Sequence, residues 1–211
     1  MPNWVDNVLT IKGEPQDIKK LKEQLAQPYS ETIDSFDTTT KQMVRQVINH
    51  DEPFSFWNIV RPPEDKMDEY HTAHGWSNGQ ETGRTPFNWY NWNLSNWGCK
   101  WDASQPQLST DRETELVYTF NTPWSPPEAV MFSLSEQYPN TDMWLRYEEE
   151  QGWGGVDHFI NGEQETEEAW DIPESHADNV AIDRDCVCSW SDDQEYWFDD
   201  CPREEIPLKI E

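Results

Sequence analysis

Polar and apolar residues alternate along several stretches of the chain, and this period of two predicts strands with one buried face. In the first of them, Val5, Leu9 and Ile11 fall on the same face. The short apolar run 54–60, closed by two prolines, predicts a buried strand. Asn161-Gly162 is a strong signal for a hairpin turn. The predicted strands are residues 3–12, 54–60, 115–122, 142–148 and 156–160.

Other stretches repeat apolar residues at every third or fourth position, which is typical of one face of a helix. Ser125-Pro-Pro-Glu128 has the residues of a capping box with proline in the first turn, and it predicts a helix start. The aromatic stripe in residues 88–102 includes Leu94 and Trp101 and is expected in the core. Residues 64–86 are polar and predict a loop with a short helix. The predicted helices are residues 15–26, 40–49, 88–102 and 125–138.

The order of these elements is β-α-β, an insertion, and then β-α-β-β. This order predicts an α+β protein with the split βαβ sheet of the ferredoxin-like kind. We expect a ferredoxin-like domain over residues 1–164 with a Trp-rich helical insertion at about 61–112. Residues 165–211 then form an acidic extension, in which aromatic residues interleave with carboxylates.

The charge of the chain is strongly acidic. It has 42 acidic and 15 basic residues, a net charge of −27 and a pI near 4.3. Residues 1–162 carry a net charge of −13 and residues 163–211 carry −14, so the last quarter holds half of the charge. The 13 Trp, 7 Tyr and 8 Phe residues indicate a folded core built from large side chains, because disordered chains are poor in aromatics.

This acidity has two interpretations, solubility and function. A folded protein of 25.0 kDa exposes roughly 10,000 Å², which gives one net charge per roughly 380 Å². Duplex DNA carries one per roughly 110 Å², so the charges resemble DNA only if they gather on one face. Self-repulsion at −27 opposes folding, and we therefore favour a functional reason over solubility alone.

Several classes of function lack their sequence signals. We find no phosphate-binding glycine loop, nucleophile elbow or His-Glu-x-x-His motif, so we expect no catalytic residues and no cofactor. The densest basic cluster, Lys19-Lys20-Lys22, is too small for direct binding of nucleic acid. The chain has no apolar run long enough to cross a membrane and no signal peptide, which predicts a cytoplasmic protein.

Two groups of residues have the chemistry of metal ligands. Cys186, Cys188 and Cys201, with His176 nearby, have the right types for zinc, but their spacing matches no usual zinc pattern. We expect reduced, idle thiols there and leave zinc as the alternative. His71 and His74 stand three residues apart and are expected to be solvated.

Several short motifs stand in a fixed order along residues 1–165. They are Met1-Pro-Asn-Trp4 with Asn7, Phe54-Ser-Phe56 before Pro62, Trp89-x-x-Trp92, Asn96-Trp-Gly98-x-Lys-Trp-Asp-Ala103, Thr122-x-Trp-Ser-Pro-Pro127 and the Gly155…Asn161-Gly162 hairpin. This set resembles the YubB-type ferredoxin-like proteins of phages and conjugative plasmids. The resemblance implies a ferredoxin-like fold and a mobile-element origin, and it supplies no catalytic residues. Cys99 stands where the resemblance leads us to expect threonine.

Acidity and the resemblance together predict an inhibitor that presents a DNA-like carboxylate surface to a host protein with a basic, nucleic-acid-binding surface. A host defence protein is the expected target by analogy. A solvated tail anchored by packed tryptophans is the alternative interpretation. The predicted partner-binding residues are Asp192, Asp193, Glu195, Asp199, Asp200, Glu204, Glu205, Trp190 and Trp197.

Two other functions remain open at this point. One is an intracellular adaptor or oligomerisation module that uses an exposed aromatic patch, with Trp76, Trp89 or Trp153 as candidates. The other is an enzyme of unknown substrate. The effect of salt on binding distinguishes the inhibitor from the adaptor. Binding driven by charge weakens as ionic strength rises, whereas binding through an apolar interface does not. The sequence leaves the oligomeric state open.

Overall fold

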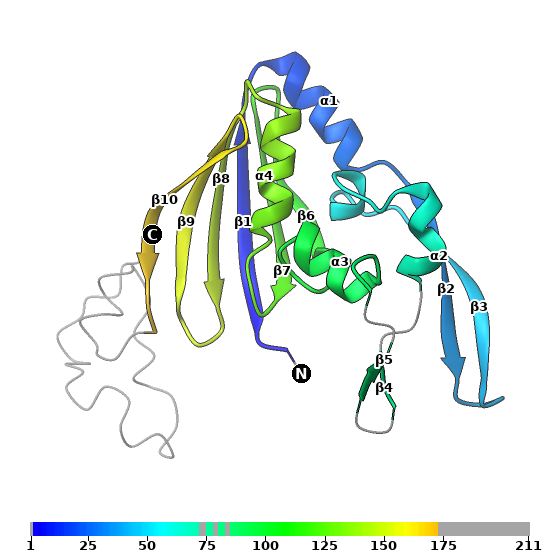
Figure 1. Ribbon diagram of the computed structural model, residues 1–211. Helices are drawn as coiled ribbons and strands as arrows, with labels where there is room; N and C mark the ends of the chain where they lie inside the picture. The colour runs from blue at the N-terminus through cyan, green and yellow to red at the C-terminus, as the bar shows by residue number, and fades with distance from the viewer. Residues whose placement is uncertain (1, 72–74, 78–79, 83–84, 173–211) are drawn as a thin grey trace.

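A six-stranded sheet dominates the computed structural model, which describes residues 2–71, 75–77, 80–82 and 85–172 (Figure 1). All neighbouring strands in this sheet are antiparallel. In spatial order the strands are β10 (Glu163–Trp170), β9 (Gly154–Ile160), β8 (Asp142–Glu149), β1 (Trp4–Lys12), β7 (Glu115–Pro123) and β6 (Ser104–Arg112).

The central part of the sheet, β8-β1-β7-β6, has the split βαβ topology. β1 and β6 run in the same direction, because both pair antiparallel with β7 between them. Helices α1 (Pro15–Leu25) and α4 (Glu128–Gln137) lie on the same side of the sheet (Figure 1). The chain therefore has the α+β ferredoxin-like fold that the sequence predicted, extended by the β9–β10 hairpin.

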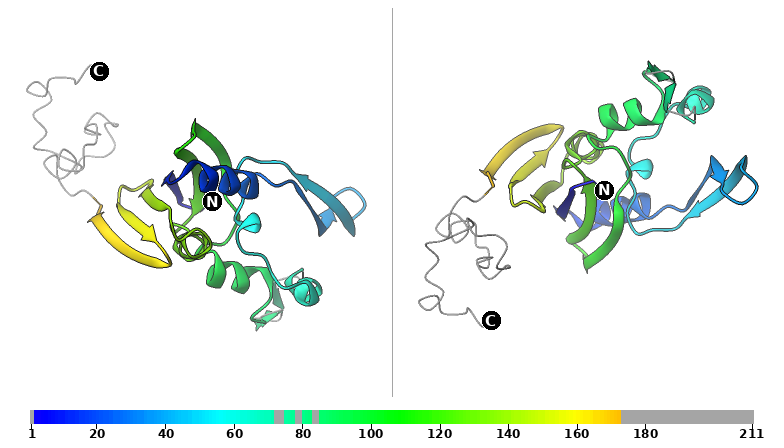
Figure 2. Two further views of the ribbon diagram at one scale, coloured as in Figure 1. Left: turned by 90° about the horizontal axis from the view of Figure 1, so that it is seen from above. Right: turned by 90° about the horizontal axis from the view of Figure 1, so that it is seen from below.

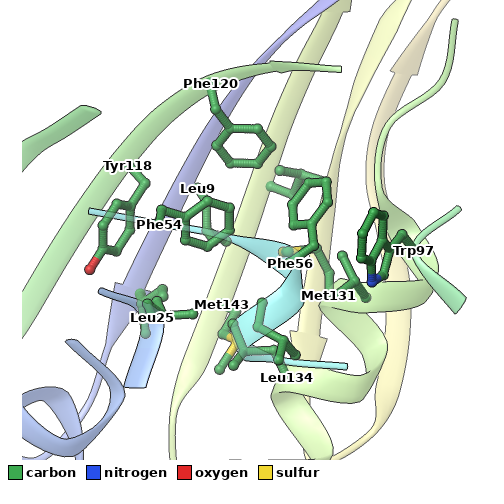
Figure 3. Packing of buried hydrophobic residues seen from close by; sticks show 14 of the residues in the cluster. Leu9, Leu25, Phe54, Phe56, Trp97, Tyr118, Phe120, Met131, Leu134 and Met143 are labelled. Atoms are coloured by element: carbon green, nitrogen blue, oxygen red, sulfur yellow. The ribbon is translucent and has the colours of Figure 1, made fainter. Parts of the chain in front are cut away.

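The hydrophobic core fills the space between the sheet and the two helices. Alternate residues of β1, β7, β8 and β9 point into it, and each helix adds one apolar stripe. Figure 3 shows Leu9, Tyr118 and Met143 of the sheet close to Leu25 of α1 and Met131 of α4. Asn7 is buried among them and donates to Thr122 Oγ1 at 2.9 Å and to the Val5 carbonyl at 2.9 Å. The fully buried apolar residues include Val5, Leu9, Ile11, Leu21, Leu25, Leu116, Tyr118, Val130, Met131, Leu134, Met143, Leu145 and Phe159.

The prediction of a strand at residues 54–60 was wrong. This run instead contains the 3₁₀ turn η1 (Phe56–Asn58), whose first backbone groups are capped by Ser55. Phe54 stacks on Phe120 with ring centroids 4.9 Å apart, so the run packs its side chains into the core without joining the sheet. The second strand of the split βαβ unit, which the run 54–60 was expected to form, is instead β6. This strand is mostly polar and lies at the edge of the sheet.

The prediction of a helix at residues 40–49 was also wrong. β2 (Tyr29–Asp37) and β3 (Gln42–His50) form a separate two-stranded hairpin. Val44, Val47 and Ile48 are β-branched, which favours a strand, and all three are exposed, so no core selects a helical face here. The hairpin extends away from the main sheet (Figure 1).

The predicted helix at 88–102 is shorter than its aromatic pattern suggested. α3 (Trp89–Asn96) ends just before Gly98, which has a φ of +85° that favours glycine. Leu94 and Trp101 are exposed and not in the core. The polar stretch before it contains η2 (Glu64–Lys66), the expected short helix as α2 (Met67–Tyr70), and an unpredicted hairpin of β4 (Gly75–Ser77) and β5 (Gln80–Thr82).

Two short motifs, Ser125-Pro-Pro-Glu128 and Asn161-Gly162, lie at the ends of regular elements. The helix predicted at residues 125–138 is present as α4, but the expected capping box is not, because α4 begins after Pro127 and has no side-chain cap. Ser125 donates instead to the Gly98 carbonyl at 2.8 Å and ties the start of α4 to the end of α3. The Asn161-Gly162 hairpin is confirmed: it joins β9 to β10, with φ values of +49° and +73°. No helix in the described part of the chain is long and apolar enough to cross a membrane.

Candidate functional site

The predicted partner-binding residues in the acidic extension lie outside the residues that the structure describes, and so do the candidate zinc ligands and His74. The first group comprises Asp192, Asp193, Glu195, Asp199, Asp200, Glu204, Glu205, Trp190 and Trp197. The second comprises His176, Cys186, Cys188 and Cys201. Cys99 is buried with a raised thiol pKa, caused first by desolvation, which fits a packing role.

One face of the sheet is covered by the helices, and the opposite face is open among the described elements (Figure 2). Residues directly opposite one another in paired strands point to the same face. The registers, together with the alternation of buried and exposed residues along β8, therefore assign the following residues to the open face. On β8, β9 and β10 they are Asp142, Trp144, Arg146, Glu148, Gly154, Val156, His158, Ile160, Glu163, Glu165, Glu168 and Trp170.

Glutamates form a column along the outer strand of this face. Glu163 pairs with Ile160, Glu165 pairs with His158, and Glu168 pairs with Val156. All three glutamates are exposed. They share the open face with Asp142 and Glu148 of β8, and among these twelve positions Arg146 is the one Lys or Arg residue. We call the outward residues of β8, β9 and β10 the acidic face.

The charge density of the acidic face is close to that of duplex DNA. Strands lie about 4.8 Å apart and outward residues about 6.7 Å apart along a strand, so each position covers about 33 Å². The twelve positions cover roughly 400 Å² and carry five carboxylates and one guanidinium. This gives one net negative charge per roughly 100 Å², compared with roughly 110 Å² for DNA.

Aromatic rings order the side chains between the two rows of acids. The Trp144 and His158 rings stack with centroids 4.0 Å apart, and His158 Nε2 lies 3.2 Å from Asp142 Oδ1. The Arg146 guanidinium lies over the Trp170 ring at 4.9 Å and its nearest nitrogen is 3.8 Å from Glu148. The single cation of the face is therefore held in place by an aromatic ring and one carboxylate.

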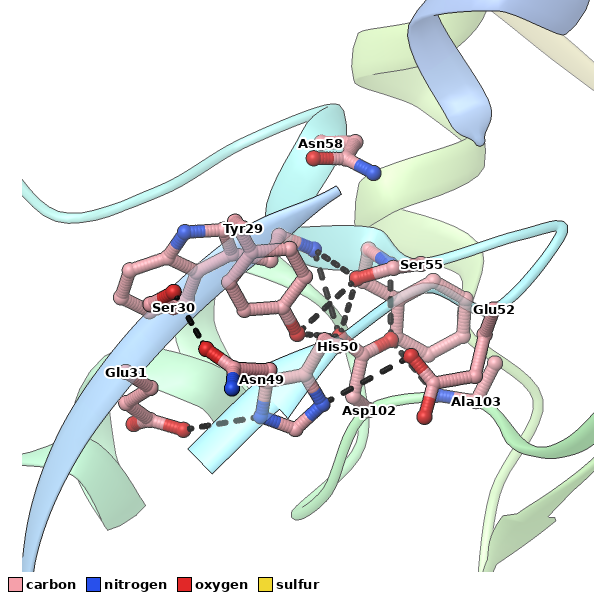
Figure 4. A network of polar contacts seen from close by, with 12 residues as sticks. Tyr29, Ser30, Glu31, Asn49, His50, Glu52, Ser55, Asn58, Asp102 and Ala103 are labelled. Carbon is pink, nitrogen blue, oxygen red and sulfur yellow. Dashed lines mark hydrogen bonds and ion pairs between the residues drawn. The ribbon is translucent and has the colours of Figure 1, made fainter. Parts of the chain in front are cut away.

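A second group of polar residues lies where the β2–β3 hairpin meets the core (Figure 4). The Asp102 carboxylate accepts hydrogen bonds from Ser55 Oγ at 2.6 Å and from the backbone N–H groups of Phe56 and Ala103, each at 2.7 Å. Burial raises the pKa of Asp102, and these hydrogen bonds partly offset that rise. Most of the acceptor capacity of this carboxylate is thus used to fix the turn at residues 55–57.

The histidine of this network is held in a stack of rings. His50 stacks on Tyr29 with centroids 4.5 Å apart, and Tyr29 stacks on Trp57 at 5.6 Å. The two ring nitrogens of His50 lie 3.7 and 3.6 Å from carboxylate oxygens of Glu31 and Glu52. Because these contacts join the base of the hairpin to the core, the arrangement favours a structural role over catalysis.

The aromatic candidates of the adaptor hypothesis are less exposed than expected. Trp89 and Trp153 are partly buried and pack against the core. Trp76 lies in β4, and its side chain is outside the described structure. Among the tryptophans whose side chains the structure describes, the exposed ones are instead Trp101 and Trp124, at 39% and 48%. Among the described residues, no group of three or more His, Cys, Asp or Glu side chains could hold a metal ion.

Sequence reasoning missed the acidic face because it assigned Glu163 to Glu168 to a turn and an extension. The one available signal was the Asn161-Gly162 turn, because a hairpin turn after β9 implies a second strand directly after it. The sequence could not show that the glutamates of β10 lie on the same face as the acids of β8. That placement depends on the register of β10 with β9 and of β9 with β8.

Residues 97–184 match a family model. Its description is the ferredoxin-like domain in Api92-like protein, and the matched range includes β6, β7, α4 and β8 to β10. A crystal structure of the protein api92 from Yersinia pseudotuberculosis is also similar, with a TM-score of 0.44 and 14% sequence identity over 82% of this chain and 100% of that chain. No curated protein matches the sequence.

Proposed function

We propose that this chain is a phage- or plasmid-encoded protein of the host cytoplasm that inhibits a host nucleic-acid-binding protein. The acidic face acts as the DNA-like surface and contacts the basic groove of the target, which we take to be a defence protein. The observation that carries the proposal is the charge density of this face, close to one net negative charge per 100 Å². The mobile-element origin rests on the sequence resemblance described above.

The charge of the acidic face determines which partners it attracts. Carboxylates arrayed at DNA-like density repel nucleic acid and attract clustered Lys and Arg side chains. Binding would then occlude the groove that holds DNA or RNA, and no chemical step is needed. Association would be fast and salt-sensitive, because charge complementarity acts mainly on the rate of encounter.

The test uses the full-length chain as bait in host lysate at low salt. We expect it to retain a nucleic-acid-binding protein that is released by added duplex DNA. The triple variant Glu163→Gln, Glu165→Gln, Glu168→Gln should lose this capture, since it removes the column of charges and keeps similar side-chain shapes. A control with the same charge change, Glu14→Gln, Glu23→Gln, Glu113→Gln, alters exposed acids outside the acidic face.

The comparison of the two variants decides the outcome. Capture that survives in the control and disappears in the β10 variant supports the proposal. Equal capture by both variants would show that the acidic face does not bind the target. A partner that resists salt and duplex DNA would favour an apolar adaptor surface instead.

A further inference from the structure

Four aromatic rings surround the ammonium group of Lys100 at one end of the sheet. The nearest are Trp101 and Trp124, whose centroids lie 4.6 and 5.3 Å from Nζ. Trp89 and Tyr90 lie at 5.8 and 5.7 Å. These distances are within the range of cation–π attraction, so the cluster already holds one cation.

The backbone beside this cluster is strained at Trp124, whose indole is exposed. Trp124 has a φ of +65°, a left-handed conformation that is costly for a bulky residue. Its N–H donates to the Asn3 carbonyl at 2.9 Å, and Thr122 Oγ1 donates to the Ser125 carbonyl at 2.8 Å. The turn is therefore held in this conformation from both sides, and Trp124 remains 48% exposed. Strain of this kind gathers at ligand sites.

An acidic hollow adjoins the cluster through Trp4. The rings of Trp4 and Trp101 lie 6.2 Å apart, and Trp4 also lines a cavity of about 350 Å³. Two carboxylates, Asp6 and Glu150, line the same cavity. The Glu150 N–H donates to the Trp4 carbonyl at 3.1 Å, which fixes the aromatic and one acidic wall together. The remaining lining residues are Ser104, Gln105 and Asn121.

The hollow continues the open face of the sheet. Asp6 of β1 pairs with Glu148 of β8, so its side chain stands beside the acidic face. It accepts a hydrogen bond from Asn121 Nδ2 through Oδ1. A partner that covers the acidic face would therefore reach the hollow with an adjoining side chain.

We propose that this hollow binds an arginine side chain of the partner protein. The planar guanidinium stacks on Trp4 and donates to the carboxylates of Asp6 and Glu150, and the exposed indoles of Trp101 and Trp124 contact the neighbouring segment. Arginine fits better than lysine because its guanidinium both stacks on an aromatic ring and donates to carboxylates in a fixed fork. This inference rests on the proposed function, since it assumes a partner with a basic surface.

The test follows the indole N–H signals of the full-length chain by NMR during titration with the peptide acetyl-(Gly-Arg)4-amide. We expect the signals of Trp4 and Trp101 to shift. The lysine peptide acetyl-(Gly-Lys)4-amide should bind several-fold more weakly, since it lacks the fork and the stacking plane. Glu150→Gln should weaken the arginine peptide about tenfold, because it removes one charge-assisted partner. Glu113→Gln is the control of equal charge change.

Three results would overturn the inference. They are equal binding of the arginine and lysine peptides, an unchanged affinity in Glu150→Gln, and binding of N-acetylarginine amide as tight as that of the peptide. The last would assign the hollow to a small guanidinium compound and not to a protein partner. The triple β10 variant should keep the Trp4 shift. If that variant loses target capture but keeps the Trp4 shift, the acidic face and the hollow bind independently. If it keeps target capture but loses the shift, the proposal for the acidic face fails separately from the proposal for the hollow.

Discussion

The carboxylates on the two sides of the sheet differ in how they affect neighbouring residues. Asp157 of β9 points into the protein, is 1% exposed and lies near Tyr147 and Glu128. Burial and these two carboxylates raise the pKa of Tyr147 to about 12. Burial, then Asp157, raises the pKa of Glu128 as well. Carboxylates on the helix-covered side of the sheet thus perturb their neighbours, whereas those on the acidic face point outward.

The Tyr147 phenol gives a testable pH dependence. The tyrosine pKa in the unfolded chain is about 10, so between pH about 10 and about 12 the folded state keeps a proton that the unfolded state has lost. Stability should therefore fall as pH rises through this window. Asp157→Asn removes one of the raising charges, and we expect a lower Tyr147 pKa in that variant. NMR titration of the Tyr147 ring measures it, and an unchanged pKa would contradict the assigned cause.

At the scale of elements, the sequence predicted correctly those strands and helices that bury one face. Strands β1, β7, β8 and β9 and helices α1 and α4 each bury one face, so the sequence pattern revealed them. The edge strands β6 and β10 are largely polar and gave no such signal. β3 was mistaken for a helix because its apolar residues are set by local β-propensity and not by a core.

The β9–β10 turn positions the glutamate column and offers a test at this scale. A Cβ on Gly162 would lie 2.5 Å from Glu136 Cγ, and its φ is +73°. We expect Gly162→Ala to lower the free energy of unfolding by about 1–3 kcal/mol, the cost of such a backbone conformation. Asn161→Gly is the matched control and should be close to neutral, because glycine accepts a φ of +49°. Urea unfolding of both variants measures this, and equal losses would contradict it.

At the scale of the whole molecule, the sequence predicted the fold better than the site. The split βαβ order could be read because the elements that define it are amphipathic, although β6 replaced the strand expected at 54–60. The acidic face could not be read, since it depends on a register that brings Glu165 and Trp144 to either side of His158. The net charge indicated a surface rich in carboxylates, and within the described residues the strand registers place five of them on one face.

The most direct test of the central claim is the salt dependence of binding to the captured host protein. The dissociation constant would be measured for the unmodified chain and the triple β10 variant across a range of salt concentrations. We expect the variant to bind at least tenfold more weakly at low salt, and the two curves to converge at high salt, because screening removes the contribution of the three charges. Parallel curves with equal affinities would show that the glutamate column of β10 does not contact the partner, and the account of the acidic face would be wrong.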